Sequence, residues 1–84
     1  MEVEFSELAY SQLIYWKKKD KKIYSRIEQL IDGIRLNAFE GIGKPEPLKY
    51  ELNGYWSRRI NKEHRLVYKV TSQNIIVISC QYHY

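Results

Sequence analysis

A helical repeat of apolar residues between positions 23 and 34 constrains the fold of this chain more than any other feature of its sequence. Its members fall at i, i+4, i+7, i+8 and i+11 and are Ile23, Ile27, Leu30, Ile31 and Ile34. This spacing places their side chains on one face of a helix. Asp20 precedes the repeat among lysines and is a suitable N-cap. Gly33 costs about 1 kcal/mol relative to alanine inside a helix, so it indicates a close helix-to-sheet contact or an early helix end.

A strand and another helix are predicted before Asp20. Glu2–Phe5 alternates polar and apolar residues, which suits a short strand and is compatible with a sheet edge. Ser6 is a good N-cap for a helix that starts at Glu7 and ends at Lys18 or Lys19. The apolar positions of this helix are Leu8, Ala9, Leu13 and Trp16. We expect the two helices to form an antiparallel hairpin joined near Asp20.

The second half of the chain has the pattern of a β-meander. Residues 39–47 contain two glycines and two prolines, which predicts a structured connection. The expected strands are 48–52, 55–60, 64–70 and 75–82, with turns at 53–54, 61–62 and 72–74. Asn53-Gly54 between two such runs is a strong hairpin signal.

These elements predict an α+β fold, with an N-terminal strand and a two-helix hairpin packed on a twisted antiparallel sheet. The chain has 84 residues, which leaves no room for a second domain, so residues 1–84 are expected to form one.

Alternation along the last two expected strands predicts which side chains face the helices. The core row consists of Leu66, Tyr68 and Val70, and in the last strand of Ile76, Ile78, Cys80 and Tyr82. Pairing 70 with 76, 68 with 78 and 66 with 80 places Arg65 opposite Gln81 on the other face. His83 then lies diagonally from Arg65. Diagonal neighbours are about 7–8 Å apart, so two long polar side chains can close around one phosphate.

Charge is distributed unevenly along the chain. Residues 1–42 hold seven Lys/Arg and seven Asp/Glu, and residues 43–84 hold seven and three, so the whole net charge of +4 lies in the second half. A localised basic surface attracts polyanions, of which nucleic acid is the commonest.

Several classes of protein are disfavoured by composition. The single cysteine, Cys80, excludes an internal disulfide and is expected to be a small core residue, and the two histidines form no metal-ligand cluster at a usual spacing. No apolar run approaches the roughly 18 residues of a membrane span, and the N-terminus has no signal-peptide h-region. We expect a soluble protein of the reducing cytoplasm that binds no membrane and needs no metal or other cofactor.

Candidate catalytic residues lie among the polar residues of the second half. Metal-free RNA cleavage through the ribose 2′-hydroxyl needs a base, an acid and positive charge on the phosphorane. His83 is a candidate acid, and the planar fork of Arg65 matches two phosphate oxygens. The base must be a carboxylate or the second histidine, His64. Glu46 is the candidate carboxylate, because prolines on both sides restrict its backbone.

Each of these residues also has an ordinary structural explanation. Glu46 would be a solvated acid in a stiffened loop, and spacing alone favours that explanation. His83 would be a frayed terminal residue, and Arg65 a surface arginine paired with Glu63. His64 lies on the opposite face from Arg65 and is assigned a structural role.

Other basic residues have the same two explanations. Arg58 and Arg59 are either phosphate ligands or a solvated strand edge that discourages aggregation. Lys44 and Lys49 lie near Glu46 and are candidate RNA contacts. The basic run 17–22 is expected to be a solvated helix corner, with phosphate contacts as the alternative.

Four ordered motifs across most of the chain carry a resemblance to a known family. They are Phe39-Glu40-Gly41-x-Gly43-Lys44-Pro45-Glu46-Pro47-Leu48-Lys49, Gly54-x-Trp56-Ser57-Arg58-Arg59-Ile60, Glu63-His64-Arg65-Leu66-Val67-Tyr68 and Cys80-x-Tyr82-His83-Tyr84. With these motifs and this length the chain resembles the YoeB/Txe family of RelE-like toxins from type II toxin–antitoxin systems. One departure is Gln81, where the family commonly has a basic residue that contacts RNA or the ribosome.

The resemblance implies a microbial-ribonuclease-like α+β fold and specific residue roles. Glu46 matches the family's general base, His83 its general acid and Arg65 its transition-state stabiliser. Tyr84 matches a terminal aromatic residue that helps to place the RNA. The cations near the scissile phosphate are then Lys49 and Arg59, with Lys44 and Arg58 as further phosphate contacts.

The resemblance also implies an mRNA endonuclease that acts on translated messages in the ribosomal A site and leaves 2′,3′-cyclic or 3′-phosphate ends. Such toxins are held inactive by an acidic antitoxin of the YefM/Phd-like kind, and they tend to form homodimers. The competing expectation is a catalytically inactive module of the same fold that binds RNA or an antitoxin.

Overall fold

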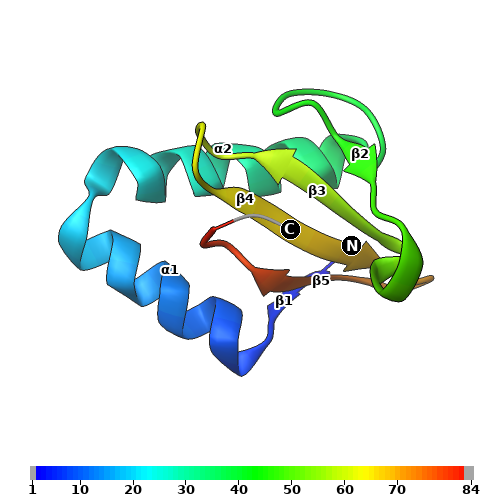
Figure 1. Ribbon diagram of the computed structural model, residues 1–84, viewed down its shortest axis with the longest axis horizontal. Coiled ribbons are helices and arrows are strands. Elements are labelled where there is room, and N and C mark those ends of the chain that lie inside the picture. The colour runs from blue at the N-terminus through cyan, green and yellow to red at the C-terminus, as the bar shows by residue number, and fades with distance from the viewer. Residues whose placement is uncertain (1, 83–84) are drawn as a thin grey trace.

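The two helices form where their caps and apolar residues predict them. The computed structural model describes residues 2–82 of the chain, so His83 and Tyr84 lie outside the described residues. The helices are α1 (Glu7–Lys19) and α2 (Lys21–Leu36). Ser6 caps α1 by accepting the N–H of Ala9, and Asp20 caps α2 by accepting two N–H groups of its first turn. Figure 1 shows that the helices meet at this corner and open away from it.

The apolar faces of both helices pack on the sheet. The helix side chains that are buried or half-buried in this core are Ala9, Leu13, Trp16, Ile23, Tyr24, Ile27, Leu30, Ile31 and Ile34. Every predicted core position of α2 is among them. Leu8, the fourth apolar position predicted for α1, is 56% exposed and lies outside the core. The other three apolar positions of α1 already span its buried stripe, and Leu8 lies beside that stripe.

Within residues 2–82, five strands form one sheet in the order β1-β5-β4-β3-β2. They are β1 (Glu2–Phe5), β2 (Glu46–Pro47), β3 (Tyr55–Arg59), β4 (Arg65–Val70) and β5 (Asn74–Ser79). Strands β3 to β5 form the predicted antiparallel meander, and β2 extends it by pairing antiparallel with β3, whereas the edge strand β1 pairs parallel with β5. The sheet is therefore mixed rather than fully antiparallel, because the helix hairpin and the meander bring β5 back in the direction of β1.

The expected strand at 48–52 is wrong. The paired residues are Glu46 and Pro47, and a 3-10 helix occupies Tyr50–Leu52 instead. Tyr50 has a left-handed backbone with φ of 59°, which interrupts an extended chain, and its carbonyl accepts the Asn53 N–H.

The last expected strand, 75–82, ends early at Ser79. Beyond that point the backbone leaves the sheet and bonds to α1. The N–H of Cys80 donates to Gln12 Oε1 at 2.8 Å, and its carbonyl accepts the indole N–H of Trp16 at 2.9 Å.

The predicted facing is correct for β4 and wrong for most of β5. Leu66 and Tyr68 are buried in the core as predicted. The observed pairs are Val70 with Ile75, Lys69 with Ile76, Tyr68 with Val77 and Val67 with Ser79, with an irregularity between Val67 and Tyr68. The predicted register holds only at Val67, so the core row of β5 is Ile75 and Val77 rather than Ile76 and Ile78. The bulge returns Cys80 to the core, whereas Tyr82 is 65% exposed.

Neither helix within residues 2–82 combines the length and the hydropathy that crossing a membrane requires.

Candidate active site

The face of the sheet that points away from the core carries a row of residues from four strands. Glu46 lies opposite Ser57, Ser57 opposite Val67, and Val67 opposite Ser79. Directly opposed residues share a face, and this row alternates with the core residues of β4. We call this side of the sheet the open face. Arg65 belongs to it, because Arg65 and Val67 are two positions apart on β4.

An ion pair on the open face joins two of the predicted catalytic residues. Arg65 Nη1 donates to Glu46 Oε1 at 2.9 Å. The side chain of Arg65 is 22% exposed and that of Glu46 is 54% exposed, so solvent reaches the pair. Arg65 thus contacts Glu46 rather than Glu63, the partner that its structural explanation named. An ion pair this exposed contributes little to stability, so it leaves both groups available for a ligand.

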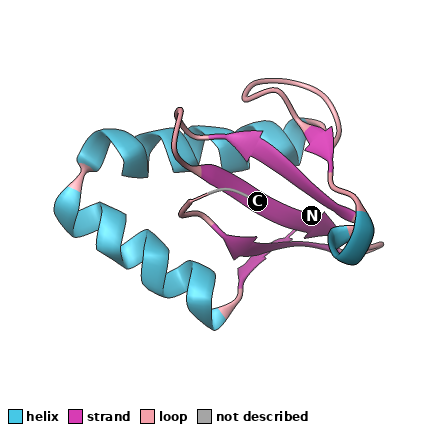
Figure 2. Cartoon of the chain, in the orientation of Figure 1, coloured by secondary structure: helices cyan, strands magenta, loops and turns pink. Residues whose placement is uncertain are grey.

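The backbone around Glu46 is fixed from both sides. Residues 37–45 arch out between α2 and β2 (Figure 2) and return to the sheet at Gly43, whose carbonyl accepts the Arg59 N–H at 2.6 Å. Gly43 has a φ of 82°, and a Cβ on it would lie 2.6 Å from Leu30 Cδ2. After Pro47, the N–H of Leu48 donates to Tyr55 at 2.9 Å. Glu46 therefore projects from a held, extended segment.

Arg58 is not a phosphate ligand, which corrects its predicted role. The side chain is 0% exposed, and the residue lies on the core face of β3. Its guanidinium donates to the carbonyls of Asn37, Glu40 and Ile42, at 2.6, 3.0 and 3.2 Å. Its Nε donates to the hydroxyl of Tyr68 at 3.1 Å. These bonds use the guanidinium inside the protein, where it ties the loop before Glu46 to the sheet.

The Arg58 cluster also explains Gly33 and Tyr68. A Cβ on Gly33 would lie 3.1 Å from Arg58 Nη1, so this glycine marks the close helix-to-sheet contact that its position in α2 indicated. The Tyr68 hydroxyl donates to the Ala38 carbonyl at 2.7 Å. Burial raises the pKa of Tyr68, and the hydrogen bond and charge of Arg58 oppose that rise.

The remaining predicted cations are exposed, and each lies near Glu46 along the chain or opposite Arg65 in the sheet. Arg59 is directly opposite Arg65 across β3 and β4, so the two residues share the open face. Lys44 and Lys49 are exposed on either side of Glu46 along the chain. Like charges placed opposite each other repel, and an anion between them would relieve this repulsion. The open face can therefore accept a phosphate beside Glu46.

Ser57 is a residue of the open face that the sequence did not single out. It is 0% exposed and lies between Glu46 and Val67 in the row, and within residues 2–82 its hydroxyl has no hydrogen-bond partner. The sequence feature that could have identified Ser57 is its position between Trp56 and Arg58, because it is a small polar residue in a strand of large side chains.

The backbone of Tyr82 is held beside Arg65. The Arg65 N–H donates to the Tyr82 carbonyl at 2.8 Å, and the Tyr82 N–H donates to His64 Nδ1 at 2.8 Å. His64 is 7% exposed and packs on Trp16, so its structural assignment is confirmed. The predicted acid His83 follows directly in sequence, outside the described residues.

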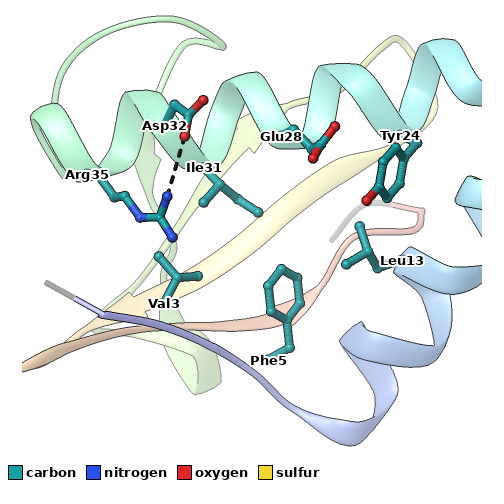
Figure 3. A pocket seen from close by; sticks show the side chains of 8 residues that line it. All are labelled: Val3, Phe5, Leu13, Tyr24, Glu28, Ile31, Asp32 and Arg35. Carbon is teal, nitrogen blue, oxygen red and sulfur yellow. Dashed lines mark hydrogen bonds and ion pairs between the residues drawn. The ribbon is translucent and has the colours of Figure 1, made fainter.

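Two other features do not belong to this site. Cys80 is buried, which confirms its core assignment, and burial raises the pKa of its thiol to about 12, so it is not a nucleophile at neutral pH. A hollow of about 240 Å³ lies between β1 and the helices. Figure 3 shows its lining, Val3, Phe5, Leu13, Tyr24, Glu28, Ile31, Asp32 and Arg35, none of which lies on the open face.

Within residues 2–82, no three His, Cys, Asp or Glu side chains lie close enough together to hold a metal ion.

Comparison with known proteins identifies relatives over the whole chain. Residues 5–84 match a family described as "YoeB-like toxin of bacterial type II toxin-antitoxin system". Toxin YoeB of Synechocystis sp. is 50% identical over 84 residues, which cover 100% of this chain and 98% of the relative.

Solved structures agree with this assignment. The YoeB/ParE toxin from Agrobacterium tumefaciens superposes with a TM-score of 0.97 at 38% identity and covers 100% of both chains. The YoeB dimer from Staphylococcus aureus gives 0.94 at 49% identity, and the S. aureus YoeB–YefM heterotetramer gives 0.92 at 49% identity. Each of these two covers 100% of this chain and 98% of the relative. The chain therefore belongs to the family of YoeB-like toxins of bacterial type II toxin–antitoxin systems.

Proposed function

We propose that this toxin is an endoribonuclease that cleaves translated mRNA in the ribosomal A site by metal-independent acid–base catalysis. The observation that supports the proposal most is the contact of 2.9 Å between Glu46 and Arg65 on the open face. It joins a carboxylate and a planar cation, which are two of the three groups that cleavage through a 2′-hydroxyl needs. The third, His83, follows Tyr82, whose backbone bonds to Arg65.

In the proposed reaction Glu46 accepts the proton of the ribose 2′-hydroxyl. The 2′-oxygen then forms a bond to phosphorus, and the bond from phosphorus to the 5′-oxygen breaks. His83 donates a proton to the leaving 5′-oxygen, so the products are a 2′,3′-cyclic phosphate and a 5′-hydroxyl. Arg65 stabilises the charge of the phosphorane with its two parallel donors.

The binding residues follow from exposure and position. Lys44 and Lys49 are exposed near Glu46 in the sequence, and Arg59 is exposed opposite Arg65; in the proposal they contact phosphates on either side of the scissile bond. Tyr84 would place the base next to the cleaved bond by stacking. Arg58 has no part in RNA binding, because it is buried.

An antitoxin and a second copy are the protein partners of this proposal. The related S. aureus toxin is described as a dimer and in a heterotetramer with YefM. We infer that this toxin also forms a homodimer and acts in the cytoplasm. An acidic YefM-like antitoxin would hold it inactive by covering the basic open face with carboxylates in place of RNA phosphates.

Mapping of mRNA 5′ ends on purified ribosomes tests the proposal. Glu46→Ala should fold normally and reduce the cleavage rate by about 100-fold or more, because one acid–base group typically contributes about 10²–10⁴-fold. Glu51→Ala is the matched control, since Glu51 is an exposed acid of the neighbouring 3-10 helix. Wild-type protein that binds the ribosome but cuts no message would be the inactive binding module instead.

A further inference from the structure

After it leaves the sheet, the C-terminal end of the described chain is held by hydrogen bonds with α1, His64 and Arg65. Gln12 and Trp16 of α1 bond to the N–H and the carbonyl of Cys80, at 2.8 and 2.9 Å. His64 and Arg65 bond to the N–H and the carbonyl of Tyr82, both at 2.8 Å. Three of these bonds are made by side chains, so they depend on which residues occupy positions 12, 16 and 64.

His64 holds Tyr82 as a neutral acceptor. Its Nδ1 accepts the Tyr82 N–H, so the proton of the neutral ring resides on Nε2. The ring is 7% exposed and packs at 4.8 Å between centroids against Trp16 and at 5.6 Å against the ring of Tyr82. Burial fixes the ring orientation, and the ring orientation fixes where Nδ1 points.

The conformation of Tyr82 needs such support. Its φ is 61°, in the left-handed region that non-glycine residues seldom adopt and keep only where their surroundings hold them. The side chain of Tyr82 is mostly exposed and supplies little packing. The two hydrogen bonds of its backbone, one to His64 Nδ1 and one from the Arg65 N–H, therefore hold this turn.

We propose that His64 is a positioning residue of the proposed cleavage reaction. Gln12 and Trp16 support the same segment through their hydrogen bonds to the backbone of Cys80. By holding the left-handed turn at Tyr82, His64 fixes the backbone residue that directly precedes the proposed acid, His83, in the sequence. This inference rests on the proposed function for its consequence, since His83 is the acid of that proposal. The hydrogen bond of His64 to Tyr82 is independent of it.

Two variants of His64 separate the hydrogen bond from the packing of the ring. His64→Phe keeps a flat ring between Trp16 and Tyr82 but removes the acceptor, whereas His64→Asn keeps an acceptor near the position of Nδ1 but removes most of the ring. We expect the Tyr82 amide to exchange with deuterium at least about tenfold faster in His64→Phe, because an unbonded amide is exposed to solvent. His64→Asn should retain most of the protection.

Single-turnover cleavage of ribosome-bound message provides the second readout. In His64→Phe we expect the cleavage rate at saturation to fall on the order of 100-fold, the effect of a catalytic group misplaced by about 1 Å, with KM nearly unchanged. His64→Asn should recover most of the rate. A ring that served only the core would give the opposite order, with the Phe variant more active than the Asn variant.

Different experimental outcomes would overturn the positioning role of His64 and the proposed function. His64→Phe that loses amide protection at Tyr82 but cleaves at the wild-type rate would overturn the positioning role. A fully active His83→Ala would overturn the proposed function, while the exchange of the Tyr82 amide would still report the hydrogen bond.

Gln12→Met serves as a second variant if His64→Phe does not fold. It removes the acceptor for the Cys80 N–H and leaves the rings intact, so the folded variant should show faster Cys80 amide exchange and slower cleavage. Folded Gln12→Met with unchanged cleavage would contradict the proposal.

Discussion

Adjacent arginines on β3 have opposite environments. Arg58 is 0% exposed and donates to three carbonyls of the loop before Glu46 and to Tyr68, whereas Arg59 is exposed on the open face. The alternation of a strand puts neighbours on opposite faces, so one arginine supports the fold and the other is available to a ligand at the surface.

Replacement of these arginines by methionine should separate stability from activity. Arg58→Met leaves three partly buried carbonyls and the buried Tyr68 hydroxyl without their donor and should lower the free energy of unfolding by about 2–4 kcal/mol. Arg59→Met should change it by less than about 0.5 kcal/mol, as exposed sites usually do, and slow cleavage instead. Urea unfolding and ribosome-bound cleavage of both variants measure the two effects. Equal stability of the two variants would contradict the assigned roles.

The buried thiol of Cys80 makes the free energy of unfolding depend on pH in the alkaline range. Burial raises the pKa of its thiol from 9.0 to about 12, so the native state keeps its proton where the unfolded state loses it. The stabilisation is complete below pH 9 and declines as the pH rises from 9 towards 12. Between pH 8 and pH 10 the wild type should lose about 1 kcal/mol more than Cys80→Ala, as measured by urea unfolding. The same loss in both proteins would show that the thiol ionises freely in the native state.

At the scale of elements, helices and strands were predicted accurately where residues close together in the sequence determine the structure, and poorly where pairing between distant segments determines it. The bounds of α1 and the start of α2 were predicted within one residue, because Ser6, Asp20 and the apolar repeat act over one or two turns. The facing of β5 was wrong, because Ile75 to Ile78 are apolar on both rows and a bulge in the β4–β5 pairing decides between them. Residue identity alone does not contain the position of such a bulge.

The site was predicted unevenly for the same reason. Glu46 was singled out from its prolines and from family resemblance, and the structure brings it to Arg65. The burial of Arg58 depends on carbonyls more than fifteen residues away along the chain, which no local pattern reveals. The bond of His64 to Tyr82 likewise joins two distant segments.

The turn before β2 depends on a glycine that the fold requires. At Gly43 a Cβ would meet Leu30 at 2.6 Å, and the φ of 82° is unfavourable for any other residue. Gly43→Ala should therefore destabilise the protein by about 2–4 kcal/mol, from backbone strain and overpacking together.

Gly54→Ala is the matched control for this substitution. Gly54 has a φ of 97° with nothing within 4 Å of its added Cβ, so only backbone strain of about 1–2 kcal/mol is expected. Thermal and urea unfolding of both variants make the comparison. A Gly43→Ala variant no less stable than Gly54→Ala would show that the turn before Glu46 tolerates a side chain.

At the scale of the whole molecule, the two faces of the sheet have different roles. The helices and the inner face supply the core, and the open face carries the ion pair and the exposed Arg59. The two roles therefore occupy separate surfaces of a chain of 84 residues.

A message with one sulfur atom in place of the 5′-oxygen at the cleaved bond tests the catalytic roles most directly. A thiolate leaves without being protonated, so this substrate needs the base but not the acid. In single-turnover cleavage on ribosomes, we expect it to restore His83→Ala to within about tenfold of the wild-type rate and to leave Glu46→Ala slow. Restoration of neither variant, or of both equally, would contradict the assignment of Glu46 as base and His83 as acid.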